Sequence, residues 1–254
     1  MKIKQLFLMA AIGLMATATF TSCEDILGEW DKPTPATVTP SGGDDDGGGS
    51  TPAVYTMAKD ATDADKGKLI CADGHIHAYG ADAECTKARV AKIIYVGNET
   101  GETTYTHGLA LALTDANNGS ICDWKTENTD AGHTKQSSST FTTESGLQYN
   151  DATHNSDTYP AFKAAIANND IAAPTGCSAW FLASGYQWAK MITAAGGAAN
   201  LKTTADGYTG LLSYRYFSSS EKDATSVWSF YPNDGAWLSL TKGTDYNVRS
   251  CLAF

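Results

Sequence analysis

The sequence predicts an α+β fold for residues 54–254, and three observations support this class. Strand patterns open and close the region, two short helical patterns lie between them, and the βαβ rhythm of a parallel sheet is missing. A hydrophobic content of 42% supplies enough apolar side chains for a packed core, so we expect the region to form one domain.

Two short runs at the start of the domain predict a β-hairpin. They cover residues 68–72 and 75–79, and the Asp73-Gly74 pair between them is a strong signal for a hairpin turn. Residues 81–88 are expected to form a short helix.

The next apolar runs indicate buried strands at residues 89–97 and 108–113. Both are β-branched or continuously apolar, and turn residues bound them. Residues 115–155 are rich in Asn, Asp, Ser and Thr with weak periodicity, so they predict long loops.

Two helices are expected in the middle of the domain, a short one at residues 159–168 and a clearer one at 185–195. Ser184 and Gln187 have the spacing of a capping box, and Gly196 supplies a C-terminal stop. The apolar side chains of the second helix recur at helical spacing and predict a core stripe: Trp188, Met191, Ile192 and Ala195.

Strand signals alone follow this helix and predict an antiparallel meander that ends at the C-terminus. The expected strands are 211–218, 227–231, 236–240 and 247–254. Because side chains alternate along a strand, Trp228 and Phe230 are expected to face the core, and Ser229 and Tyr231 to face solvent.

The N-terminus predicts export. Lys2 and Lys4 precede a short apolar run over residues 6–15, which is too short for a membrane span, so residues 1–22 form a signal peptide. The ending Thr21-Ser22-Cys23 resembles a bacterial lipobox, which implies a lipidated Cys23; the alternative is an ordinary secretory signal with Cys23 as a bystander.

A tether is predicted between this signal and the domain. Residues 23–53 combine Pro, Gly, Ser and Asp runs that cannot form a packed core. Glu24-Asp25 resembles the surface-export signals of Bacteroides-type lipoproteins, which implies the outer face of an outer membrane. With 18 Lys and Arg against 28 Asp and Glu, we expect contact with the membrane through the lipid only, and no nucleic acid as a partner.

Several segments carry a resemblance that covers nearly all of residues 55–254. Residues 179–188, 217–221 and 247–254 resemble the signature segments of the Fibrobacter major paralogous domain, and residues 72–74, 94–97 and 107–113 resemble gut-bacterial members of the same group. That group is similar to C-type lectin-like domains, so the resemblance implies a compact α+β unit with short helices, whose N- and C-terminal strands pair.

The final strands also resemble the variable proteins of diversity-generating retroelements. The scaffold frame is Trp228, Phe230, Gly235, Trp237 and Val248-Arg249. The resemblance implies that the remaining positions form a ligand-binding face, or an ordinary solvated face in a relative that does not vary: Ser229, Tyr231, Asn233, Asp234, Ala236, Leu238, Ser239, Leu240, Asp245 and Tyr246.

No cofactor or metal is expected. Cys71, His75, His77 and Cys85 have a spacing that matches no common zinc pattern. Tyr231 stands where calcium-dependent lectin-like domains carry an acid or amide, which argues against calcium.

The sequence does not predict an enzyme. Gly-x-Ser-x-Gly, His-Glu-x-x-His and P-loop motifs are missing. His107, His133 and His154 lie in predicted loops, where we expect them to be polar surface.

Five cysteines remain after Cys23, so at least one thiol must be free or intermolecular. Because lectin-like folds often staple the final strand, the resemblance favours a disulfide between Cys177 and Cys251.

Together these features predict a surface-anchored, adhesin-like binding module. Its C-terminal β face would recognise a protein or glycan ligand on a host cell, another bacterium or a phage. The alternative is a structural or pilus-associated lipoprotein subunit, in which the same face packs on a partner.

Overall fold

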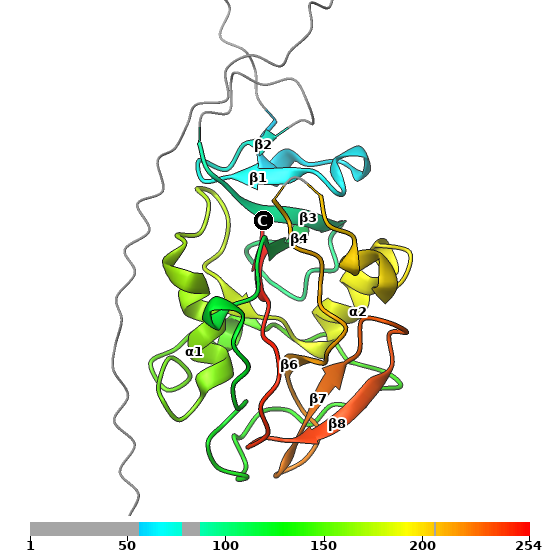
Figure 1. The fold of residues 1–254 in the computed structure, drawn as a ribbon. Helices are drawn as coiled ribbons and strands as arrows, with labels where there is room; N and C mark the ends of the chain where they lie inside the picture. Colours follow the sequence, from blue (N-terminus) through cyan, green and yellow to red (C-terminus); the bar gives the residue numbers. More distant parts are fainter. Residues whose placement is uncertain (1–55, 78–86, 206) are drawn as a thin grey trace, which may run out of the picture. The chain divides into compact units, whose positions relative to one another are not determined.

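Two antiparallel sheets carry the fold in the computed structural model (Figure 1). The structure describes residues 56–77, 87–205 and 207–254, which belong to one compact unit, 52–254. The predicted signal peptide, Cys23 and the whole predicted tether lie outside the described residues, as does most of the predicted helix at 81–88.

The larger sheet has six strands in the order β2-β1-β3-β4-β9-β5. Their bounds are β1 (Leu69–Cys71), β2 (Ile76–His77), β3 (Arg89–Val96), β4 (Gly108–Ala112), β5 (Phe181–Leu182) and β9 (Ser250–Ala253). The predicted hairpin is confirmed, since β1 pairs with β2 in antiparallel register.

The smaller sheet has the order β6-β7-β8, with β6 (Tyr216–Glu221), β7 (Ser226–Phe230) and β8 (Trp237–Thr241). The two main helices are α1 (Pro160–Ala167) and α2 (Gly185–Ala194). Short helices with antiparallel sheets confirm the α+β class. Neither of these helices has the length and apolar character of a membrane span, and the same holds for the other described helices.

The C-terminal strand differs from the prediction. It does not continue the β6-β7-β8 meander but enters the larger sheet, where β9 pairs with β4 and β5. The expected direct pairing of N- and C-terminal strands is therefore wrong, because β3 and β4 separate β1 from β9. The reason is burial: Cys251 and Leu252 pack into cores on opposite faces of the sheet, so the strand takes an interior position.

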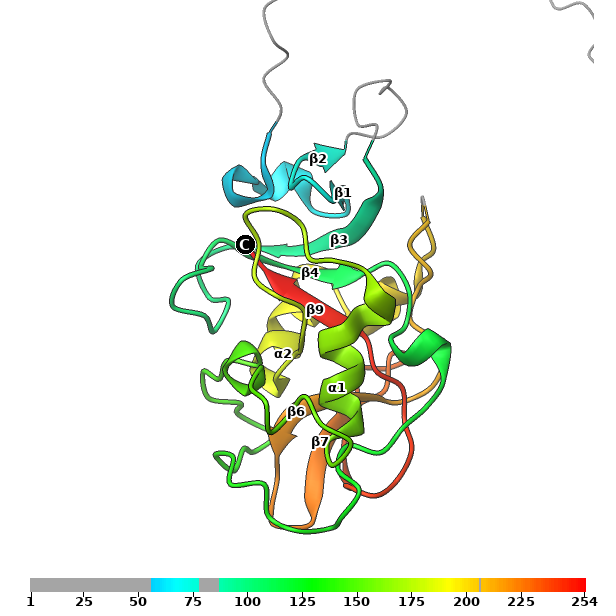
Figure 2. The ribbon, with the colours of Figure 1, turned by 90° about the vertical axis from the view of Figure 1, so that its left-hand side faces the viewer.

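Strand β4 shows how the sheet separates two cores. Leu109 and Leu111 face the cluster that also holds Trp188 and Met191 of α2, while the alternate side chains of β4 join a second cluster. This alternation follows from the period of two along a strand. In Figure 1 the C-terminal segment runs between α1 and α2, and in Figure 2 it continues past α1 on the side away from α2.

Helix α2 begins as its sequence predicts. The Ser184 hydroxyl accepts from the Gln187 backbone N–H, and the Gln187 side chain accepts from the Ser184 N–H at 2.9 Å. Gln187 also donates to the Thr100 carbonyl at 2.9 Å and to Glu102 at 2.7 Å, which ties the helix to the loop after β3. Gly196 has φ +72°, the left-handed conformation that ends helices.

A third core lies between α1 and the smaller sheet. It contains Trp124 from the loop region, Phe162 from α1, and Phe217 and Val227 from the sheet. Long loops predicted over 115–155 are confirmed, with only two short 3-10 turns inside them.

Candidate ligand-binding groove

The residues predicted to form one C-terminal face do not share a surface. Ser229 is 0% exposed and its hydroxyl donates to the Leu238 carbonyl at 3.0 Å, so its prediction as a solvent-facing residue is wrong. Strand β7 is the middle strand of its sheet, and both of its faces are covered: Val227 belongs to the core under α1 and Phe230 to the core under α2.

Tyr231 and Asn233 form a separate polar group beyond the end of β7. The Asn233 amide donates to the Tyr231 hydroxyl and accepts from Lys202, and the Arg215 guanidinium lies 5.5 Å from the centre of the Tyr231 ring. Asp234 accepts from the Ala236 backbone N–H at 2.8 Å and so stabilises the turn into β8.

The remaining predicted residues also lie in different surroundings and do not form one face. Leu240 and Tyr246 pack against the third core, whereas Leu238 is 45% exposed. Burial and the nearby Asp245 carboxylate both raise the pKa of Asp123, which places Asp245 beside a second acid. Ser239 accepts a hydrogen bond from Lys222.

Trp228, which the sequence predicts to face the core, is only half-buried, and the frame residue Trp237 is half-buried as well. Trp237 lines a groove of about 580 Å³, a volume typical of ligand clefts. The groove is bounded by the turn before β1, the end of β3, the 138–141 loop, α2 and the start of β8. Its lining comprises Asp63, Lys66, Tyr95, Val96, Glu99, Ser138, Ser139, Phe141, Tyr186, Ala189, Lys190, Thr193, Ala194 and Trp237.

One wall of the groove is aromatic, and neighbouring residues fix its position. The Phe141 ring lies 4.5 Å from the Trp237 ring and 6.3 Å from the Trp228 ring, with the latter pair edge to face. Gly185 allows this position, because a Cβ there would overlap the Phe141 ring. The Trp228 indole N–H donates to the Gln136 carbonyl at 2.7 Å, which fixes the segment that leads to Phe141.

The charges in the groove are paired with one another. Lys190 lies 2.7 Å from Glu99, and Lys66 lies 3.3 Å from Asp63. The hydrogen bond to Glu99 raises the pKa of Lys190, whose ammonium also lies 5.2 Å from the centre of the Tyr186 ring. The groove therefore combines aromatic surface and hydroxyl groups with little net charge.

Sequence reasoning missed this groove, although one signal was present. Tyr186, Ala189, Lys190 and Thr193 recur at i, i+3, i+4 and i+7, so they share the face of α2 opposite the Trp188–Met191 stripe. The groove residues outside α2 come from four separate segments, which only the tertiary fold brings together.

The prediction of exposed loop histidines is wrong for His133 and His154, which are both buried. Their Nε2 atoms lie 2.9 Å apart, and His133 stacks on Tyr149 with ring centres 3.7 Å apart. Phe162 of α1 packs against both imidazole rings. The loop region that carries His133 and His154 enters the core here, because aromatic side chains cover the two imidazole rings.

The predicted disulfide is also wrong, since Cys177 and Cys251 are free. Cys251 packs into the core under α2, whereas Cys177 packs on the cluster across the sheet, so the sheet separates the two thiols. Cys71 is disulfide-bonded, and its partner lies outside the described residues.

Within the described ranges, no group of three or more His, Cys, Asp or Glu side chains is placed to hold a metal ion. Among the residues considered for zinc, Cys71 is in a disulfide and His75 lies 3.1 Å from Asp73.

No protein-family model matches this chain, and no curated protein does. Among solved structures, the chain is similar to the crystal structure of a fimbrial protein from Bacteroides ovatus, with 18% sequence identity and a TM-score of 0.43. The match covers 74% of this chain and 48% of the other, so the chain spans about half the length of that protein.

Proposed function

We propose that this protein is a lipid-anchored binding module of the bacterial surface, and that the groove between α2 and β8 is its ligand-binding site. The observation that carries the proposal is the fixed aromatic wall of Phe141 and Trp237 beside a charge-paired, hydroxyl-bearing floor. Ligand clefts typically combine apolar surface with a few polar groups that set orientation.

The chemistry of the groove fits a neutral glycan best. Glu99 and Asp63 each lie beside a lysine, so the groove offers little net charge to attract an ionic ligand. Sugar rings present C–H faces to aromatic side chains and hydroxyl groups to polar ones, and the groove offers both kinds of partner, including Ser138 and Ser139.

A panel of neutral and acidic oligosaccharides tests this proposal directly. The purified full-length protein should bind neutral members, and added salt should change the affinity little because ion pairing contributes little. Binding restricted to acidic members would contradict the proposed ligand class. If the protein bound other proteins and no sugars, its ligand would be a protein, which is the other ligand class that the sequence predicts.

Membrane anchoring is part of the proposal and rests on the sequence. A basic start, a short apolar run and Cys23 after small residues support lipidation, and the 23–53 tether would hold the domain away from the membrane. Cys23→Ser should abolish incorporation of labelled palmitate and release the protein from the membrane fraction. Unchanged labelling would refute lipidation at this residue.

The C-type lectin-like fold and retroelement diversification remain proposals supported by the sequence segments around 179–188 and 217–254. A reverse transcriptase gene beside a near-copy of the 3′ coding end, differing at adenines, would establish diversification.

The rival function is a structural or pilus-associated subunit. Such a subunit would cover Trp237 and Leu238 on assembly, and it would be oligomeric or aggregated when purified alone. We expect a monomer in sedimentation experiments. A non-enzymatic role also fits the groove, because its two carboxylates are both held in ion pairs.

A further inference from the structure

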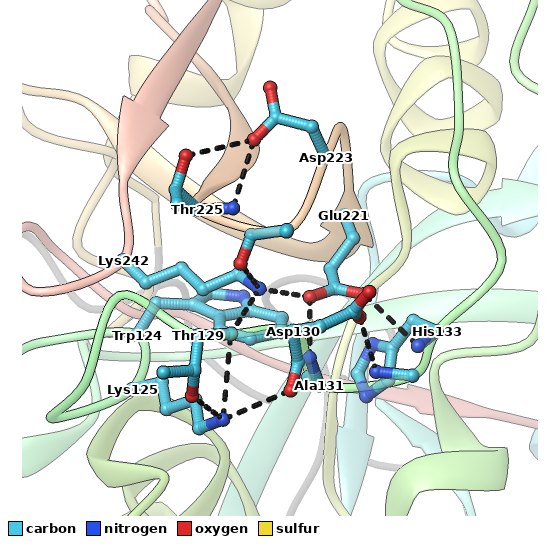
Figure 3. A network of polar contacts seen from close by, with 12 residues as sticks. Trp124, Lys125, Thr129, Asp130, Ala131, His133, Glu221, Asp223, Thr225 and Lys242 are labelled. Carbon is cyan, nitrogen blue, oxygen red and sulfur yellow. Dashed lines mark hydrogen bonds and ion pairs between the residues drawn. The ribbon is translucent and has the colours of Figure 1, made fainter.

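A buried lysine and a buried glutamate meet at the end of the smaller sheet. Glu221 ends β6 and Lys242 follows β8, and both side chains are 0% exposed. Figure 3 shows the two side chains pointing toward one another, with Trp124 and Thr129 beside them. Burying an ammonium removes its hydration shell, which is costly unless oxygen atoms replace the water.

Three oxygen atoms replace it here, two from the end of β6 and the β6–β7 connection and one from the loop around Thr129. The Lys242 ammonium donates to the Glu221 carboxylate and to the carbonyls of Thr129 and Ala224, both at 2.8 Å. The Trp124 ring covers the ammonium with its centre 5.3 Å away. We define this set of three oxygens under one aromatic ring as the cation cradle.

The cradle is built for a single positive charge. Burial alone would raise the pKa of Glu221, but hydrogen bonds from Lys135, Lys242 and the Ala131 backbone outweigh it and lower the pKa, so the group is a carboxylate. Two further ammonium groups lie around it: Lys135 pairs with the second Glu221 oxygen, and Lys125 lies 3.4 Å from the Thr129 carbonyl. A divalent ion would add a charge that these lysines repel.

We propose that the cation cradle is a binding site for a monovalent, ammonium-type cation, and that the chain fills this site from within with Lys242. Backbone carbonyls and a carboxylate are the oxygen ligands by which proteins replace the hydration of such ions. Lys242 is a cation that belongs to the chain itself. It thereby holds the loop around Thr129 on the sheet without an exchangeable ion.

The cradle is connected to the proposed ligand groove. The Glu221 carbonyl accepts from the Gln136 N–H at 2.8 Å, and the Gln136 carbonyl in turn accepts from Trp228. The same loop continues to Phe141, which forms the aromatic wall. Filling the cradle with Lys242 therefore makes this wall independent of metal or salt.

Chemical rescue tests the proposal. Lys242→Ala in the full chain leaves space for a small cation, and we expect Tm to fall by roughly 10 °C. Methylammonium should restore most of this loss in a saturable manner, and potassium a smaller part. Tetramethylammonium at equal ionic strength should not, because its methyl groups donate no hydrogen bonds and keep its charge away from the three oxygens, which a bare potassium ion can approach directly.

Lys135→Ala is the matched control, because Lys135 pairs with the same Glu221 carboxylate but its side chain is 36% exposed. Its smaller loss of Tm should not respond to methylammonium. If Lys242→Ala does not fold, refolding with and without methylammonium replaces the Tm measurement, and refolding only with it supports the proposal. An unchanged Tm, equal effects of methylammonium and tetramethylammonium, or no rescue would each overturn it.

Discussion

The Nε2 atoms of His133 and His154 lie 2.9 Å apart, at the centre of a buried series of polar contacts. Both ends of this series are hydrogen-bond acceptors. His133 Nδ1 donates to the Ser219 carbonyl at 3.1 Å, and His154 Nδ1 donates to Asp151 at 2.9 Å. Both Nδ1 atoms must therefore carry hydrogen. A neutral imidazole carries one hydrogen, so in a neutral His133 that hydrogen is on Nδ1.

This pair predicts a loss of stability in mild acid. Burial lowers the pKa of His133 from 6.5 to about 4. The unfolded chain takes up this proton near pH 6.5, whereas the folded protein does not until about pH 4. The free energy of unfolding should therefore fall as the pH drops through this window, by about 3 kcal/mol from this residue.

Urea denaturation of the wild type and of His133→Gln at pH 7 and pH 4.5 measures this contribution. Gln keeps a donor for the Ser219 carbonyl but does not titrate. The drop between the two pH values should be smaller in the variant by about 2 kcal/mol. Equal drops would show that His133 does not carry the acid sensitivity.

A second prediction concerns Arg249, which is fully buried. Its Nε donates to Asp115 at 2.7 Å, and its two terminal nitrogens donate to the carbonyls of Ala112 and Thr209 at 2.8 and 3.0 Å. Arg249→Met leaves the Asp115 carboxylate without its cation, so we expect a loss of about 3–5 kcal/mol in the free energy of unfolding.

Lys163→Ala provides the control for this measurement, because its ion pair with Asp157 is solvent-exposed. Chemical denaturation should show a change below about 1 kcal/mol for it. A similar small effect for Arg249→Met would contradict the account of the buried ion pair.

Two of the free cysteines, Cys177 and Cys251, are expected to react slowly. Burial raises the pKa of Cys177 to about 12 and the pKa of Cys251 well above its usual value. Because the thiolate is the nucleophile, iodoacetamide at pH 8 should label neither thiol in the native protein and both in urea. Peptide mapping by mass spectrometry checks the labelling, and a peptide that joins Cys177 to Cys251 would refute this account.

Local signals predicted α2 well. The Ser184–Gln187 capping box and the Trp188–Met191 stripe depend on residues three or four positions apart, and the structure has both. Strands β3, β4, β7 and β8 were also predictable, because their apolar runs end at turn residues.

Properties that depend on distant segments were not predictable. Ser229 is buried because two separate cores cover β7, and nothing near it in the sequence indicates this. Lys242 resembles an ordinary turn residue until Thr129, 113 positions away, supplies an oxygen atom. The groove depends in the same way on the 138–141 loop meeting β8.

The most direct test compares two neighbouring residues of β8. Trp237 lines the groove, and Leu238 points to the other side of the strand, where it is 45% exposed. With the neutral oligosaccharide that the wild type binds most tightly, calorimetry should show at least about tenfold weaker binding for Trp237→Ala. Leu238→Ala should bind like the wild type. Loss of binding in Leu238→Ala with full binding in Trp237→Ala would contradict the proposed site in the groove. It would place the ligand on the opposite side of β8.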